Sequence, residues 1–63
     1  MDDLTKAMAV AIWNKMDKNE KTGVRFGLFP ANKMREAEKE GFNGKDLCVA
    51  LMDCATKNGG MVA

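Results

Sequence analysis

The chain has 63 residues, with ten basic and nine acidic side chains and a net charge of +1. A chain of this length forms one domain at most and lies near the lower limit for folding alone. The balanced charge excludes the strongly basic surface that is typical of proteins that bind nucleic acid non-specifically. We expect one domain over residues 1–60 and a short C-terminal tail over residues 61–63.

The composition leaves few groups for catalysis or metal binding, since histidine, tyrosine and serine are all absent. Cys48 and Cys54 lie on or near an apolar helix face with no evident base beside them. Their spacing along a helix corresponds to about 9 Å, whereas a disulfide needs Cα atoms within about 7 Å, so we expect reduced thiols. We therefore predict no enzyme activity, no cofactor and no metal. Without a metal or a disulfide, oligomerisation remains the expected external source of stability for so short a chain.

No apolar run is long enough for a signal peptide or a membrane span. The longest, residues 7–13, is bounded by a lysine and an asparagine. Together with the reduced cysteines, this pattern predicts a soluble, cytoplasmic protein without a membrane partner.

The first predicted element is a helix that begins at Asp2 or Asp3, where a carboxylate can cap it, and ends near Met16 or Lys18. At about 100° per residue, its apolar face consists of Leu4, Ala7, Met8, Ala11 and Ile12, with Met16 at the margin. Val10 and Trp13 lie on the opposite, polar side. Two interpretations of Trp13 are open: it packs against another part of the chain, or it anchors a subunit or partner interface.

A polar segment, D-K-N-E-K-T, follows over residues 17–22 and is interpreted as a solvated loop. It begins like a calcium loop, with Asp17 and Asn19 as oxygen ligands. However, Lys21, Thr22 and Leu28 stand where that motif needs a ligand, a glycine and a bidentate glutamate. We do not expect calcium binding.

Residues 24–29, V-R-F-G-L-F, alternate apolar with mixed side chains and predict a strand. A lone strand leaves its backbone N–H and C=O groups unpaired, and no other strand pattern occurs in the chain. The segment is therefore either an extended connector over the helices or a strand that pairs with its copy in a second subunit. The expected fold is mainly α (small α+β), helix–strand–helix–helix, with homodimerisation favoured.

Two helices are predicted after this strand. The first runs from Pro30 to about Glu40, and Gly41 ends it in a left-handed conformation. Asn43 caps the second, which we expect to end at the Asn-Gly-Gly sequence of residues 58–60. The apolar face of this last helix consists of Leu47, Ala50, Leu51, Cys54 and Ala55, with Cys48 at its edge and Val49 opposite.

The segment T-G-V-R-F-G-L-F-P-A-N over residues 22–32 resembles the end of a Src homology three domain, which reads G-L-F-P-x-N-Y-V. In that family a tryptophan, the proline and the tyrosine line a groove for proline-rich peptides, which would give that role to Trp13 and Pro30. In this chain Lys33 replaces the tyrosine, one residue is inserted between the glycines, and helical patterns replace the first half of the domain. We therefore do not predict this fold.

The order of strand, proline-opened helix, glycine turn and helix is similar to the ribbon-helix-helix family of dimeric DNA-binding repressors. In that family paired strands read the major groove. The resemblance implies base contacts from Arg25, Gly27 and Phe29, and phosphate contacts near Asn43 and Lys45 at the start of the last helix. The chain departs from the family in its additional first helix and in a shorter helix after the strand, and only Arg25 suits base recognition.

We predict a small non-enzymatic protein-binding module, a regulator or inhibitor of the kind that viruses and mobile elements encode. It would bind itself, another protein or both. The predicted interface residues are Val10, Trp13, Arg25, Phe26 and Phe29. The alternative is a ribbon-helix-helix-like repressor that contacts DNA through Arg25, Asn43 and Lys45.

Overall fold

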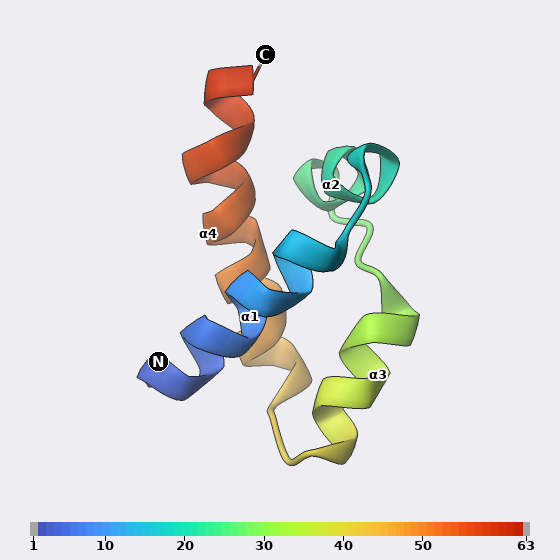
Figure 1. The fold of residues 1–63 in the computed structure, drawn as a ribbon, viewed down its shortest axis with the longest axis vertical. Helices are drawn as coiled ribbons and strands as arrows, with labels where there is room; N and C mark the ends of the chain where they lie inside the picture. The colour runs from blue at the N-terminus through green and yellow to red at the C-terminus, as the bar shows by residue number, and fades with distance from the viewer. Residues whose placement is uncertain (1, 63) are drawn as a thin grey trace.

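The computed structural model describes the backbone of residues 2–62 and the side chains of residues 2–57. It contains the four helices α1 (Asp3–Lys15), α2 (Lys18–Arg25), α3 (Ala31–Lys39) and α4 (Gly44–Val62). The longest, α4, contacts each of the other three helices, and α1 also contacts α3 (Figure 1). The prediction of a mainly helical fold is confirmed. The predicted strand is wrong, because residues 2–62 contain no strand.

Helix α1 begins where the sequence predicts, because the Asp2 carboxylate accepts a hydrogen bond of 2.8 Å from the Thr5 backbone N–H. The side that it buries differs from the prediction. The buried residues of this helix and its C-cap are Thr5, Ala9, Ile12, Trp13 and Met16. Leu4 is 70 % exposed. Apolar residues lie on nearly every side of α1, so contact with α4 selects the buried face, and the large Trp13 ring defines it.

Helix α2 replaces the solvated loop that was predicted for residues 17–22, and that prediction is wrong. The Glu20 N–H donates to the Asp17 carboxylate at 2.8 Å, and the Asp17 N–H donates to the Glu20 carboxylate at 3.1 Å. This reciprocal capping box satisfies two backbone donors at the helix start. Val24, one turn further along, is fully buried in the core and fixes the helix against the rest of the molecule.

The predicted strand is the end of α2, a left-handed turn and a short link to α3. Gly27 has φ +84°. The Gly27 N–H donates to the Val24 carbonyl at 3.0 Å, and the Leu28 N–H donates to the Gly23 carbonyl at 2.8 Å. These two bonds form a Schellman motif. Strand pairing across a dimer was expected only because the backbone groups of this segment needed partners. The chain itself supplies partners at this turn, so that reason for a dimer no longer holds.

Replacing Gly27 with alanine is expected to destabilise the protein by about 1–2 kcal/mol, because a Cβ disfavours the left-handed conformation. Gly23→Ala is the matched control in the same motif. A Cβ at Gly23 would lie 3.4 Å from the Leu28 oxygen and 3.5 Å from the Leu28 Cβ, which are ordinary contacts. The control should stabilise α2 by up to about 1 kcal/mol. Urea unfolding followed by circular dichroism measures both, and a Gly27→Ala protein as stable as the control would contradict the turn.

Helix α3 ends in a second Schellman motif, as the sequence predicts. Gly41 has φ +99°, and its N–H donates to the Glu38 carbonyl at 3.0 Å. The Phe42 N–H donates to the Ala37 carbonyl at 3.2 Å, and the Phe42 side chain packs against the core. On the inner side of α3, Met34 and Ala37 are buried.

Helix α4 carries the centre of the core. Asn43 caps it by accepting hydrogen bonds from the backbone N–H groups of Lys45 at 2.9 Å and Asp46 at 3.2 Å. The predicted face is confirmed: its buried residues are Leu47, Ala50, Leu51 and Ala55, with Cys48 and Cys54 partly buried beside them.

The predicted end of α4 is wrong, because the helix continues through the glycines of residues 59 and 60 to Val62. Each added residue gains a backbone hydrogen bond in a helix that is already formed, and this offsets the cost of about 1 kcal/mol for each glycine. Of the predicted tail, residues 61 and 62 belong to α4, and Ala63 lies outside the described residues. No helix in the described part of the chain has both the length and the apolar character to cross a bilayer.

Candidate protein-binding surface

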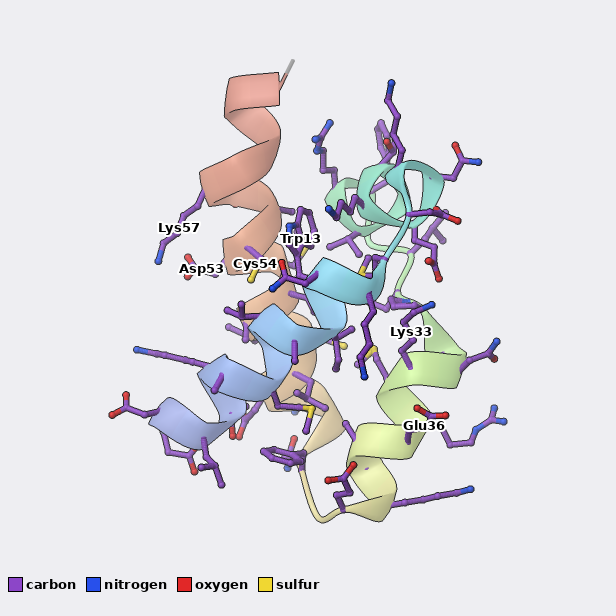
Figure 2. All side chains as sticks on the ribbon, viewed as in Figure 1. Trp13, Lys33, Glu36, Asp53, Cys54 and Lys57 are labelled. Carbon is purple, nitrogen blue, oxygen red and sulfur yellow. The ribbon has the colours of Figure 1, made fainter. Side chains whose placement is uncertain are left out.

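Trp13, one of the predicted interface residues, lies in the core and is only 7 % exposed. It belongs to the core cluster against which Cys54 of α4 packs, and both side chains are labelled in Figure 2. The Lys21 Nζ of α2 lies 5.3 Å from the ring centroid, within cation–π distance. The first interpretation of Trp13 therefore describes the structure: the ring packs against its own chain.

Two of the three most exposed large apolar side chains of the described residues lie just beyond the end of α2, and the third, Leu4, is on α1. Phe26 is 79 % exposed and Leu28 is 70 % exposed. Lys18 and Arg25 are exposed on α2 itself and form no ion pair with the described residues. We name four of these residues the α2 tip: Arg25, Phe26 and Leu28 lie at the end of the helix, and Lys18 is its first residue, two turns away on the same side.

A glycine explains why Leu28 remains in solvent. In a Schellman motif, the residue after the left-handed glycine usually packs against a residue in the last helical turn. At the end of α3, Phe42 has Ala37 in that position, and Phe42 is partly buried. At the end of α2 the equivalent of Ala37 is Gly23, which offers no side chain to Leu28. A hollow of about 290 Å³ lies there, lined by Asn19, Glu20, Gly23, Leu28, Phe29 and Pro30.

An ion pair fixes α2 to α3 beside this hollow. The Lys33 Nζ lies 3.1 Å from the Glu20 carboxylate, and both side chains are about one-third exposed, at 30 % and 32 %. Glu20 also belongs to the capping box, so one carboxylate connects the start of α2 with α3. Because Lys33 pairs with Glu20, that carboxylate does not neutralise the cations of the α2 tip.

The structure brings together three of the five predicted interface residues. Arg25 and Phe26 belong to the α2 tip, and Phe29 follows it in the link to α3, partly buried against the core. Val10 is 48 % exposed but lies on α1, and Trp13 is buried. The sequence interpretation did not include Leu28 or Lys18 in the interface. The D-x-x-E capping box and Gly27 would have indicated a helix that ends in a turn there.

The predicted DNA-contacting residues lie on different parts of the molecule. Arg25 is the last residue of α2, whereas Asn43 and Lys45 lie at the start of α4, near the turn that follows α3 (Figure 1). The Asn43 side-chain oxygen already caps α4. The ribbon-helix-helix arrangement needs a strand at residues 24–29, and these residues form none, so the structure does not support this resemblance.

The cysteine environments disfavour a reactive thiolate. Burial, and secondly the Glu38 carboxylate, raise the pKa of the Cys48 thiol. Burial, followed by Asp53, raises the pKa of Cys54, and Lys57 opposes this in part. The described residues contain no group of three or more candidate ligands that could hold a metal ion.

We expect iodoacetamide to alkylate both cysteines more slowly in the folded protein than in the urea-unfolded chain at the same mildly alkaline pH. The reason is that only the thiolate reacts, and the folded protein holds a smaller fraction of it. Mass spectrometry of quenched samples measures the two rates. A folded-state rate equal to or above the unfolded rate would contradict the described burial.

No protein-family model, no curated protein and no solved structure significantly matches this chain. A functional interpretation therefore depends on the exposed residues of the α2 tip.

Proposed function

We propose that the chain is a small non-enzymatic protein-binding module that presents the α2 tip to its partner and acts as a regulator. One observation carries this proposal: Phe26 and Leu28 are 79 % and 70 % exposed on one short turn. Single exposed apolar residues are common on protein surfaces, whereas clustered ones mark interaction sites. Aromatic side chains and arginine, both present in the α2 tip, are enriched where binding energy is concentrated.

The backbone that carries the α2 tip is fixed before any partner binds. The capping box fixes the start of α2, the Schellman motif fixes its end, and the Glu20–Lys33 pair joins it to α3. Buried Val24 lies between these ends. A preordered segment loses less conformational entropy on binding than a flexible one, so more of the contact energy contributes to affinity.

The test compares protein capture from the native cell by three forms of the chain. The tip variant is Phe26→Ser with Leu28→Ser. The matched control is Val49→Ser with Met52→Ser, which also removes two exposed apolar side chains, 57 % and 39 % exposed, but from α4. The tip variant should lose at least about tenfold in affinity for the captured protein once that protein is purified, equivalent to about 1.4 kcal/mol, and the control should bind like the wild type.

Capture that is equal for the wild type and the tip variant would contradict this proposal. So would an equal loss in the tip variant and in the control, because the effect would then not depend on the location of the apolar residues. Circular dichroism of all three proteins shows whether each one is folded.

A further inference from the structure

A second hollow lies between the start of α1 and the turn that joins α3 to α4. Figure 1 shows these two segments at the end of the molecule away from α2. The volume of the hollow is about 270 Å³. It is lined by Asp2, Leu4, Thr5, Glu40, Gly41, Phe42, Asn43 and Asp46. We name it the α1–α4 hollow.

The α1–α4 hollow combines apolar side chains with acidic groups. Leu4 is 70 % exposed, and Phe42 is partly buried beside it. The carboxylates of Asp2, Glu40 and Asp46 border them and form no ion pair within the described residues.

The charge of this region is negative at neutral pH. Hydrogen bonds from the Thr5 side chain and the Thr5 backbone hold the pKa of Asp2 below its usual value, so Asp2 remains ionised. Asp3 adds a further carboxylate at the start of α1, and Lys45 is the one basic residue in the adjoining first turn of α4. The end of α2 differs from this region, since Arg25 directly precedes exposed Phe26; Lys18 lies two turns back on the same side of the helix, next to the capping residue Asp17.

We propose that the partner of the α2 tip is a second copy of this chain, whose α1–α4 hollow receives Phe26 and Leu28 while its carboxylates face Lys18 and Arg25. This inference rests on the proposed function and names the partner. The two surfaces lie at opposite ends of one molecule (Figure 1), so the association is head-to-tail and leaves a tip and a hollow unoccupied at the ends of each open chain of subunits.

Charge distinguishes this arrangement from a two-fold dimer of tips. Pairing two α2 tips would bring Lys18 and Arg25 of one copy toward the same cations of the other, which is unfavourable. Pairing a tip with a hollow places opposite charges together and covers Leu4 as well as Phe26 and Leu28. The hollow is also slightly smaller than the roughly 300–1,000 Å³ typical of small-molecule sites, and it suits one or two side chains.

Sedimentation velocity of the wild-type protein is the first part of the test. The weight-average mass should rise with concentration between the micromolar and millimolar ranges and continue past the mass of two chains. It should fall on addition of salt, because salt screens the attraction between exposed charges. A wild-type protein that stays monomeric throughout, or that stops at two chains, overturns the head-to-tail proposal.

A mixing experiment tests the two surfaces separately. The tip variant is Arg25→Glu with Phe26→Ser, and the hollow variant is Leu4→Ser with Glu40→Lys; all four wild-type side chains are exposed, so both proteins should fold. Each variant alone should associate at least about tenfold more weakly than the wild type, equivalent to about 1.4 kcal/mol. An equimolar mixture should form a dimer, because one variant retains its hollow and the other retains its tip.

Loss of association in the tip variant alone, with the hollow variant unaffected, would show tip-to-tip pairing and overturn this inference. So would the absence of a dimer in the mixture when both variants are folded by circular dichroism. The capture experiment separates this inference from the proposed function. If the wild type is monomeric but its tip still binds a different protein, only the head-to-tail inference fails. If the tip binds neither, both fail.

Discussion

Leu51→Ala is expected to remove most of the protein's stability in water at room temperature. Leu51 is 0 % exposed and belongs to the core cluster to which all four helices contribute. Truncating a buried leucine costs about 2–5 kcal/mol, since the removed methyl groups leave a cavity. The core of a chain this short supplies only about 3–5 kcal/mol in total, so one substitution removes most of the stability. Urea unfolding followed by circular dichroism measures the loss.

Met52→Ala is the control for this prediction. Met52 is the next residue on α4, has a side chain of similar size and is 39 % exposed. Surface substitutions usually change the free energy of unfolding by no more than about 0.5 kcal/mol. Equal destabilisation by the two substitutions would contradict the assignment of Leu51 to the core and of Met52 to the surface.

Trp13→Ala is the second substitution with a large expected effect, about 3–5 kcal/mol, because it removes the largest aromatic side chain of the core. Its burial at 7 % exposure has a spectroscopic consequence in the wild type. Trp13 is the only tryptophan in the chain, so its fluorescence should be blue-shifted at every dilution, including concentrations at which the protein is monomeric.

Lys21→Ala is the matched control for Trp13. The lysine lies over the ring on its α2 side, and losing this contact should cost only about 0.5–1 kcal/mol without exposing the ring. Red-shifted emission in the dilute wild type, followed by a blue shift on association, would contradict the core assignment and restore the interpretation of Trp13 as an interface anchor.

The ends of three helices could be predicted from the sequence because each depends on a few adjacent residues. Asp2 caps α1, the Gly41 turn ends α3, and Asn43 caps α4, all through hydrogen bonds that span only a few positions. Such bonds form wherever the local sequence permits them, whatever the rest of the chain does.

The sequence of α2 does not identify it as a helix, because two local signals conflict there. The alternation of Val24, Phe26 and Leu28 matches a strand, whereas Asp17 and Glu20 match a capping box. In the structure, Val24 is buried and Phe26 and Leu28 are exposed, so the alternation marks no common face. A helix is more stable here than an unpaired strand, because the helix pairs its own backbone N–H and C=O groups.

The buried side of α1 depends on tertiary contact. Ala7 and Ala11 favour one side of the helix, whereas Ala9 and Trp13 favour another, and both patterns fit an amphipathic helix. Contact with α4 buries the second side and leaves Ala7 and Ala11 exposed. A single helix cannot indicate which side its neighbour will cover.

Part of the candidate surface follows from the sequence, but the physical reason for its exposure differs from the one that the sequence suggests. The sequence pattern places Arg25, Phe26 and Phe29 in a strand that needs a partner. The structure satisfies that backbone internally, yet Phe26 remains 79 % exposed. Leu28 belongs to the surface because Gly23 gives it no side chain to pack against. The number and spacing of apolar residues in the sequence do not show that these two positions meet.

Site-specific photo-crosslinking in the native cell tests the central claim, that the α2 tip is where this chain binds another protein. A photoreactive phenylalanine derivative replaces Phe26 in one variant and Val49, 57 % exposed on α4, in the control. We expect a discrete crosslinked product on irradiation at position 26 and none at position 49, and a product with the mass of two chains would identify the second copy. No product at position 26, or the same products at both positions, would contradict the claim.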